Sequence, residues 1–350
     1  MEGPAAECLR GGRAAVPSKH ALRLARCLHP KFPHLGPAVS PCRSGHTSQR
    51  RAGYDGRAGG RRIARASMKR DARSDARAAA RLLDAIRTRR PIVHHLANFV
   101  TIADVAAATR AVGAMPIMAM SPSEIEDVTA RADALVISLG TPTEERLRAI
   151  NLAVTAARKR AIPIVIDPVG AGASKHRTEA SLKVIRAATW PIIRANPAEA
   201  AALVGEAAEL RGVESTGAPD PKAVGPKVIK DGGVAVITGP SDVVTNGTRT
   251  LVVDNGHPWL AAMPGAGCMA TALIGAFVAV AGVADFVTAA AGGIACLGLA
   301  AERAAARARG PGTLKPALID ALFTMTAKDL AAGMRCRPVP ASPGRRRATR

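Results

Sequence analysis

Short apolar runs alternate with longer helical segments from Met68 to about residue 333, and this alternation restricts the fold more than any other feature. Each apolar run is bounded by Gly, Pro or polar residues, as expected for buried strands. The expected strands are residues 91–95, 116–120, 134–139, 164–166, 192–193 and 234–237. The expected helices are residues 78–87, 102–111, 143–160 and 197–204, with another beginning in a capping-box pattern at 123–126. This order predicts an α/β fold with a mostly parallel central sheet covered by helices on both faces.

The end of the domain departs from the simple alternation. A hairpin is expected at residues 242–253, followed by a glycine loop and closing helices. The stretch 269–299 is rich in Ala and Gly, and Asp285 interrupts it. It therefore fits two tightly packed, buried helices better than a membrane span. We expect no membrane association.

The net charge of +22 is concentrated at the two ends of the chain. Residues 1–67 hold 13 Lys or Arg and 3 Asp or Glu, whereas residues 334–350 hold 6 Arg and no acid. We predict a disordered basic extension (1–67), one domain (68–333) and a disordered Arg-rich tail (334–350). The extension could be a true basic tail, an organelle-targeting segment, or sequence upstream of a real start at Met68.

Composition also restricts the partners and the compartment. The basicity lies outside the domain and aromatic residues make up only 2% of the chain, which argues against nucleic acid as a partner. Six cysteines are scattered without Cys-x-x-Cys or Cys/His metal spacing, and only Cys268 and Cys296 fall in the predicted domain. A disulfide framework is therefore not expected, and we expect a cytoplasmic protein.

Polar and glycine-rich motifs follow the ends of the predicted strands. They are His94 with Asn98, Gly140-Thr141, Asp167, Arg194 with Asn196, Thr238-Gly239, and the loop Gly265-Ala266-Gly267-Cys268. In an open α/β sheet, ligands bind beyond the carboxyl ends of the strands. One crevice could therefore collect all of these motifs.

The loop at residues 265–268 runs directly into an apolar helix. A helix N-terminus offers unpaired N–H groups to an anion, and glycine permits close approach of the backbone. The loop is thus a candidate phosphate site, although a buried turn that enters a core helix is the plain alternative. Cys268 should have a lowered pKa at this position and could accept a proton from a substrate hydroxyl. An inert buried cysteine is the alternative.

Asp167 and Glu199 are candidate ligands for Mg²⁺, which prefers one or two carboxylates together with water and phosphate oxygens. Asp167 precedes Pro168 at a strand end, and a simple turn would explain it equally. Glu199 lies in the first turn of a helix that begins at Pro197, where an acid favours the helix dipole without any ligand.

Three further side chains have both a binding interpretation and a structural one. Arg194, after an apolar strand, could bind a phosphate or form a salt bridge. Thr238 could contact a nucleotide phosphate or cap a turn. Met118 could form an apolar, polarizable wall for a small ring, or belong to the core.

The order of these motifs resembles the hydroxyethylthiazole kinases, thiamine-salvage enzymes of the ribokinase-like fold, from about Pro91 to Leu330. The motifs are Val93-His94-His95-Leu96-Ala97-Asn98, Gly113-Ala114-Met115-Pro116-Ile117-Met118-Ala119, Gly140-Thr141, Asp167-Pro168-Val169-Gly170-Ala171-Gly172-Ala173, Arg194-Ala195-Asn196-Pro197-Ala198-Glu199, Ile237-Thr238-Gly239, Asn255-Gly256-His257, Gly265-Ala266-Gly267-Cys268 and Gly310-Pro311-Gly312. The resemblance implies a three-layer α/β/α fold and ATP-dependent phosphorylation of the primary hydroxyl of 4-methyl-5-(2-hydroxyethyl)thiazole.

The resemblance also implies roles for individual residues. The sets are substrate-binding Asn98, Met118, Gly140 and Gly265; ATP-binding Arg194, Asn196 and Thr238; magnesium-binding Asp167 and Glu199; and catalytic Gly265, Ala266, Gly267 and Cys268. Cys268 stands where many ribokinase-like relatives have a catalytic aspartate. The family is typically a homotrimer with sites between neighbouring subunits.

The chain departs from the family pattern at several positions. Relatives usually have Thr where Pro264 stands, Asn where Ser138 stands and Asn where His95 stands. Two alternative functions therefore stay open. One is a ribokinase-like kinase for another small heterocyclic alcohol such as a hydroxymethylpyrimidine, and the other is a degenerate, non-enzymatic homologue.

Overall fold

The computed structural model describes residues 71–206, 209–211, 214–216, 219–229 and 233–339. The predicted basic extension, residues 1–67, lies outside the described residues. The account below concerns the described part of the chain from residue 71 onward.

The predicted α/β sheet is present. In the described residues it has nine strands in the order β11-β10-β9-β8-β5-β4-β3-β1-β2. The strands are β1 (Ile92–Leu96), β2 (Met115–Ile117), β3 (Ala134–Ser138), β4 (Ile164–Asp167), β5 (Ile192–Ala195), β8 (Val234–Ile237), β9 (Asp242–Thr245), β10 (Thr250–Val253) and β11 (Cys336–Val339). Pairing is parallel from β2 through β8, whereas β9, β10 and β11 are each antiparallel to their neighbours. The carboxyl ends of the parallel strands thus meet at one edge of the sheet.

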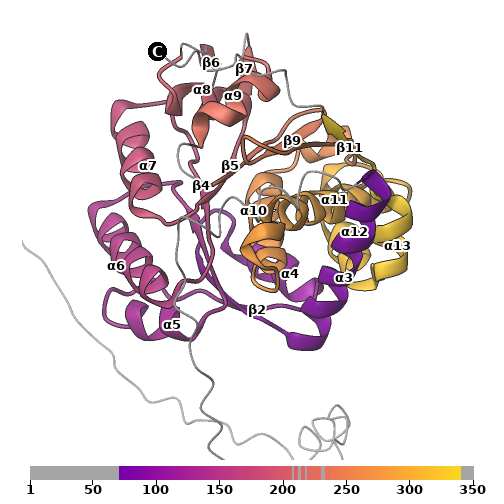
Figure 1. Cartoon of the computed structure of the whole chain (residues 1–350), viewed down its shortest axis with the longest axis horizontal. Coiled ribbons are helices and arrows are strands. Elements are labelled where there is room, and N and C mark those ends of the chain that lie inside the picture. Colours follow the sequence, from indigo (N-terminus) through magenta and orange to yellow (C-terminus); the bar gives the residue numbers. More distant parts are fainter. Residues whose placement is uncertain (1–70, 207–208, 212–213, 217–218, 230–232, 340–350) are drawn as a thin grey trace, which may run out of the picture. The chain divides into compact units, whose positions relative to one another are not determined.

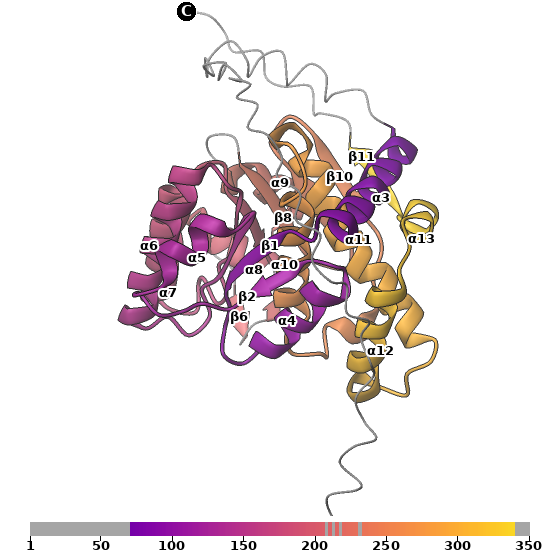
Figure 2. The same cartoon turned by 90° about the horizontal axis from the view of Figure 1, so that it is seen from below.

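Helices cover both faces of this sheet, which confirms the three-layer α/β/α prediction (Figures 1 and 2). One layer contains α3 (Ala72–Arg89), α4 (Ile102–Ala111), α10 (Ala266–Val278), α11 (Phe286–Ala305), α12 (Pro311–Thr324) and α13 (Ala327–Gly333). The other contains α5 (Ile125–Arg131), α6 (Glu144–Arg160), α7 (Lys175–Ala187), α8 (Pro197–Leu203) and α9 (Pro221–Val228). β6 (Glu209–Arg211) and β7 (Glu214–Thr216) pair antiparallel in a separate two-stranded sheet. The three-residue 3-10 helices η1 (Pro258–Leu260) and η2 (Val283–Asp285) flank α10.

Helices α10 and α11 form the predicted pair of tightly packed helices. A Cβ atom at Gly293 would lie 2.9 Å from the Ile274 Cα atom, so glycine lets the two backbones approach closely. The segment Val283–Ala305 is long and apolar enough to cross a membrane, but 83% of its most apolar window is buried against the rest of the domain. Its apolar composition is therefore explained by its place in the core.

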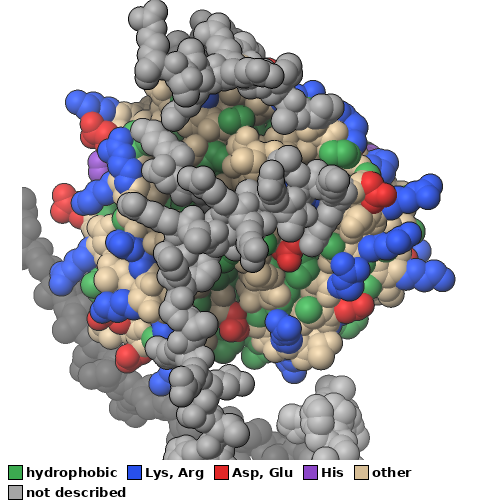
Figure 3. Space-filling model, in the orientation of Figure 1, with side chains coloured by type: hydrophobic (Ala, Val, Ile, Leu, Met, Phe, Trp, Pro, Cys, Tyr) green, Lys and Arg blue, Asp and Glu red, His purple; other side chains and the backbone are tan. Residues whose placement is uncertain are grey.

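Charged side chains of both signs lie around the rim of the face that Figure 3 shows. Lys and Arg side chains there are interspersed with Asp and Glu. Among the described residues, Arg303 and Asp329 form a salt bridge with an N–O distance of 2.9 Å.

The structure corrects several predicted bounds. The strand expected at 116–120 is Met115–Ile117, and the helix expected at 78–87 is Ala72–Arg89. The Arg-rich tail was expected from residue 334, but Cys336–Val339 form β11, which pairs with β10; residues 340–350 lie outside the described residues. The capping box expected at 123–126 is also wrong. Helix α5 begins at Ile125 with Glu124 as its N-cap, and the Ser123 hydroxyl instead lies 2.7 Å from the Ser121 hydroxyl.

Two neighbouring histidines in β1 are buried in the core. His94 Nε2 lies 2.8 Å from the Ala119 carbonyl oxygen and Nδ1 lies 2.9 Å from Thr129 Oγ1. His95 Nε2 lies 3.1 Å from Thr109 Oγ1. Burial, reinforced by the charge of His94, lowers the pKa of His95 to about 3. Both rings are therefore neutral at neutral pH.

The buried His95 predicts acid sensitivity. Between its ordinary pKa of 6.5 and the folded value of about 3, the unfolded chain binds the extra proton, so stability falls as the pH falls. Between about pH 8 and pH 5 this single group removes about 2 kcal/mol from the free energy of unfolding. We expect His95→Gln to lose about 2 kcal/mol less than the wild type over this range, measured by urea unfolding. Equal losses in both proteins would contradict this assignment.

Candidate active site

The carboxyl ends of β4, β5 and β8 meet the N-terminus of α10. Asp167 is the last residue of β4, Arg194 lies in β5, and Thr238 directly follows β8. Gly265 is the N-cap of α10 and has φ +93°, a conformation that favours glycine. The predicted convergence of these motifs on one edge of the sheet is therefore what the structure contains.

A buried ion pair joins two of these strands. Arg194 Nη1 lies 3.5 Å from Asp167 Oδ1, and the Asp167 side chain is fully buried. Thr271 Oγ1, on α10, donates to Asp167 Oδ2 at 2.9 Å, whereas Oδ1 accepts no hydrogen bond. Burial raises the pKa of Asp167, and the positive charge of Arg194 opposes that shift. Burial by itself would lower the pKa of Arg194, but the carboxylates of Asp167 and Glu199 raise it above its ordinary value.

Arg194 lies directly against the backbone of the glycine loop. Its Nη2 donates to Thr238 Oγ1 at 2.7 Å. A Cβ atom at Gly267 would lie 2.4 Å from Arg194 Nη1, so only glycine leaves room for the guanidinium at this point. The loop thus brings a positive side chain and the positive end of α10 to the same place.

Two N–H groups in the first turn of α10 face no carbonyl of their own helix. Gly267 and Cys268 are the second and third residues of α10, where intrahelical partners are lacking. The N–H of Ala266 is already used, because it donates to the Met263 carbonyl at 3.2 Å. Of the loop residues predicted to form an anion cradle, Gly267 and Cys268 are therefore the better placed.

Glu199 and Asn196 form a capping box at the start of α8. Asn196 Oδ1 accepts from the Glu199 N–H at 2.8 Å, and Glu199 Oε2 accepts from the Asn196 N–H at 3.0 Å. Glu199 Oε1 also accepts from the Gly170 N–H at 2.9 Å, which ties the loop after Asp167 to α8. Burial and the nearby Asp167 charge raise the pKa of Glu199, with Arg194 opposing. The capping alternative for Glu199 is thus realised, and each carboxylate oxygen keeps a free lone pair.

Cys268 lies in a small apolar cluster beside this loop. The cluster contains Ala97, Val105 and Ala272, with Ile102, Met118, Met120 and Cys268 packed against it. Burial and the charge of Asp167 raise the pKa of the Cys268 thiol, although the Thr101 and Ser138 hydroxyls and Arg194 act in the opposite direction. The prediction of a lowered pKa is therefore wrong, because desolvation outweighs the helix terminus.

Asn98 and Gly140 are brought together on the neighbouring strand ends. A Cβ atom at Gly140 would lie 2.2 Å from Asn98 Nδ2, so the amide rests on the glycine backbone. Thr141 Oγ1 donates to Asn98 Oδ1 at 3.3 Å. Gly265 is also close to this region, because its Cβ would lie 3.1 Å from Thr101 Cγ2 at the start of α4. His94 does not join this group, since its ring bonds within the core.

Three polar residues near the site were not predicted from the sequence. Thr271 holds Asp167 from α10, one helical turn beyond Gly267. Asp242 Oδ1 accepts from the Gly239 N–H at 2.9 Å, and burial raises the pKa of Asp242 to about 7. Arg146 donates to backbone carbonyls of β1 and β3. Of these three residues, only Asp242 had a local sequence signal, which is its short spacing from Gly239.

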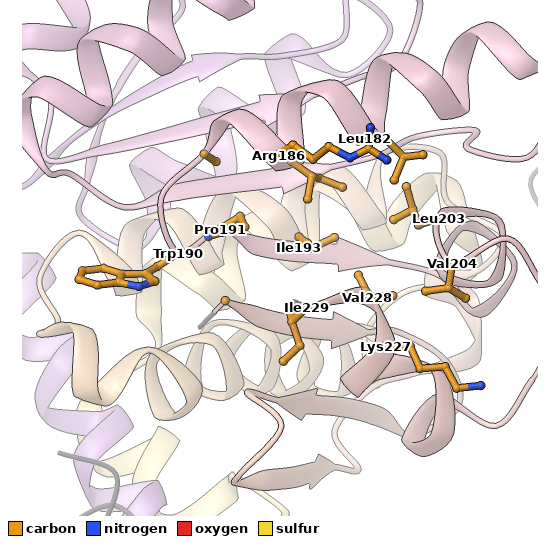
Figure 4. Close-up of a pocket in the computed structure, with 13 residues that line it drawn as sticks. Leu182, Arg186, Trp190, Pro191, Ile193, Leu203, Val204, Lys227, Val228 and Ile229 are labelled. Carbon is orange, nitrogen blue, oxygen red and sulfur yellow. The ribbon is translucent and has the colours of Figure 1, made fainter. Parts of the chain in front are cut away.

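A cavity of about 450 Å³ lies away from this site, between α7, α8 and α9 (Figure 4). Its walls are mostly apolar, with Trp190, Ile193 and Ile229 among them and the cationic Arg186 and Lys227 at its border. The candidate site residues are not part of its lining.

Within the described residues, no cluster of three or more His, Cys, Asp or Glu side chains could hold a metal ion.

The contact between Gly267 and Arg194 generates a prediction. Gly267→Ala should displace the guanidinium and, with ATP as the phosphoryl donor that the family resemblance implies, raise the KM for ATP about tenfold or more, because a small misplacement of a binding group is costly. Alanine favours the helix, so folding should be retained. Gly282→Ala, at a position with no heavy atom within 4 Å of the added Cβ, is the matched control. An unchanged KM in Gly267→Ala, measured by steady-state kinetics, would count against this placement of Arg194.

Comparisons with known proteins place the chain in a family. Residues 83–328 match the model of the hydroxyethylthiazole kinase family. Hydroxyethylthiazole kinase of Desulforudis audaxviator is 45% identical over 258 residues, covering 73% of this chain and 94% of the relative. Hydroxyethylthiazole kinase of Roseiflexus castenholzii is 41% identical over 256 residues, with 73% and 94% covered.

The solved structures agree. Hydroxyethylthiazole kinase protein from Pyrococcus horikoshii OT3 superposes with a TM-score of 0.66 at 33% identity, covering 75% of this chain and 98% of that one. A ribokinase-like superfamily protein from Enterococcus faecalis V583 has a TM-score of 0.51 at 14% identity, which shows a shared fold. The chain belongs to the hydroxyethylthiazole kinase family.

Proposed function

We propose that this protein transfers a phosphoryl group from ATP to the primary hydroxyl of 4-methyl-5-(2-hydroxyethyl)thiazole, which supplies the thiazole phosphate in thiamine salvage. The relatives named above are hydroxyethylthiazole kinases. The observation that carries the proposal is the Asp167–Arg194 pair, held against the N-terminus of α10 and beside the apolar cluster that contains Met118 and Cys268.

The transferred phosphoryl group is placed at the start of α10. Phosphoryl transfer has a loose transition state, so positioning and neutralisation of charge dominate its catalysis. The N–H groups of Gly267 and Cys268 donate to the phosphoryl oxygens. Arg194 adds a positive charge on the same side, and Thr238, bonded to Arg194, orients the guanidinium toward the ATP phosphates.

The residues present fit a magnesium ion beside the phosphates. Asp167 Oδ1 is buried and accepts no hydrogen bond, which suits a direct metal ligand. Glu199 accepts two backbone hydrogen bonds and suits an indirect role through water. We assign Asp167 and Glu199 to this site, where Mg²⁺ would neutralise phosphate charge when bound. Asn196 contributes through its cap on α8, which fixes the Glu199 carboxylate.

The alcohol is placed between the strand ends and the apolar cluster. Met118 forms an apolar wall next to Cys268, and Asn98, resting on Gly140, supplies polar groups at its edge. Gly265 lies beside Thr101 at the start of α4, next to this region. Cys268 accepts the hydroxyl proton in its thiolate form. It is only a modest base, because its raised pKa leaves the thiol mostly protonated at neutral pH.

The family departures fall in different places. His95 is buried in the core, where its ring contacts the Thr109 hydroxyl. Ser138 lies next to Cys268, where its hydroxyl influences the thiol. The effect of Pro264 on activity stays a prediction, as do the homotrimeric assembly and the cytoplasmic location.

A substrate panel tests the proposed function. The purified full-length chain, with ATP and Mg²⁺, should phosphorylate the thiazole alcohol with a higher kcat/KM than a hydroxymethylpyrimidine. Preference for the pyrimidine would replace the proposed substrate. Absence of turnover on either alcohol by a folded preparation that still binds ATP would overturn the proposal.

The assigned roles predict unequal effects of two substitutions. Asp167→Ala should lower kcat by about 10³-fold, because it removes charge placed for the transition state. Cys268→Ala should lower kcat by no more than about 10²-fold, because a thiol is a weak base near neutrality. Comparing kcat for the two variants at saturating substrates checks this order. A larger loss in Cys268→Ala would reverse the roles.

The raised pKa of Cys268 predicts a pH profile. The thiolate is the proton-accepting form, so kcat in the wild type should rise with pH from the neutral range and keep rising above the ordinary thiol pKa, because the pKa of Cys268 is raised. Cys268→Ala should lack this alkaline rise. The measurement is kcat against pH for both proteins, and parallel profiles would exclude Cys268 as the base.

A further inference from the structure

Arg146 connects the carboxyl ends of β1 and β3 from the first turn of α6. Its Nη1 donates to the Ala97 carbonyl at 2.7 Å, and its Nη2 donates to the carbonyls of Leu96 at 2.8 Å and Ser138 at 2.6 Å. Leu96 ends β1 and Ser138 ends β3. One guanidinium therefore bonds to three carbonyls at the ends of two strands, because Ala97 directly follows β1.

The arrangement is unusual for a buried cation. Arg146 is only 7% exposed, and no carboxylate of the described residues lies within ion-pair distance of it. Burial disfavours the charged form of Arg146 and therefore lowers its pKa. A buried charge without a counter-ion is costly, and the three carbonyl dipoles are what offsets the cost. The planar, forked guanidinium can reach several acceptors at fixed angles, which a lysine ammonium cannot do.

These hydrogen bonds lie where the backbone pairing between β1 and β3 ends. The parallel register of β1 and β3 ends at the Leu96–Ile137 pair. Beyond that pair, the chain segments continue to Asn98 on one side and Gly140 on the other. Arg146 bonds to the carbonyl of Ala97, directly before Asn98, and to that of Ser138, two residues before Gly140. Its Cζ atom also lies 5.9 Å from the centre of the exposed Phe99 ring. It thus fixes the separation of two segments that contact each other again at Asn98 and Gly140.

We propose that Arg146 is a positioning residue for the alcohol-binding side of the site, which sets the spacing of Asn98 and Gly140 without touching the substrate. The inference rests on the proposed placement of the alcohol at these residues. It predicts that loss of Arg146 changes the KM for the alcohol and the KM for ATP to different extents. The proposed ATP-binding residues are Arg194 in β5 and Thr238 directly after β8. Arg146 makes no hydrogen bond to either of these strands.

Two substitutions and one control test this role kinetically. Arg146→Lys keeps the positive charge but cannot make all three bonds, and Arg146→Met removes the charge. Each should raise the KM for the thiazole alcohol about tenfold or more while the KM for ATP changes by less than about threefold. Arg148→Met, an exposed arginine on the same helix, should change neither. A purely structural role would instead lower the fraction of folded enzyme and leave both KM values unchanged, and that result would overturn the proposal.

Hydrogen exchange provides a readout that does not need activity. In Arg146→Lys, backbone amides of residues 97–101 and 139–142 should exchange at least about tenfold faster, with no change at residues 265–271. Equal exchange rates in the wild type and the variant at these residues would overturn the positioning role, even if the variant enzyme is active. If the wild type fails to phosphorylate the thiazole alcohol, the proposed function fails, while the exchange experiment still decides whether Arg146 holds the two strand ends.

Discussion

The buried ion pair between Asp167 and Arg194 is the interaction on which the site depends. It joins the ends of β4 and β5, and Thr271 attaches the same carboxylate to α10. Arg194 also bonds to Thr238 after β8, so four side chains connect the ends of three strands to one helix. Such a pair is costly to bury and does not by itself make a protein more stable. Its value here is that it places one carboxylate and one guanidinium at the helix N-terminus in a single arrangement.

Small residues make that arrangement sterically accessible. Gly267 lets the guanidinium lie on the loop backbone, and Gly140 lets the Asn98 amide lie on the neighbouring strand end. Gly293 lets α10 pack closely against α11, which fixes the position of the helix N-terminus relative to the sheet. The low aromatic content of the chain is consistent with this design, because the core is built from Ala, Val, Ile and Leu at close backbone distances. The positive end of α10 and the charge of Arg194 then act on the same small volume.

Much of the fold and of the polar framework could be predicted from the sequence, because apolar runs mark the strands and polar residues follow their ends. Asp167, Arg194, Thr238 and the 265–268 loop meet for this reason. Other features depend on tertiary contacts that spacing does not encode. From the sequence alone, Arg146 resembles a surface residue of an amphipathic helix. The sequence of β11 resembles part of a basic tail, and only its pairing with β10 shows that it is a strand. The pKa of Cys268 was misjudged because the helix terminus is visible in the sequence, whereas its burial and the Asp167 charge are not.

A double-mutant cycle on Asp167 and Arg194 tests the central claim most directly. The kcat/KM for ATP would be measured at saturating thiazole alcohol for Asp167→Asn, Arg194→Met and the double variant, with circular dichroism confirming that each is folded. If the pair acts as one unit, the double variant should lose little more than the worse single variant, so the two effects are strongly non-additive. Losses that simply multiply would show that the two side chains act independently and would contradict the account.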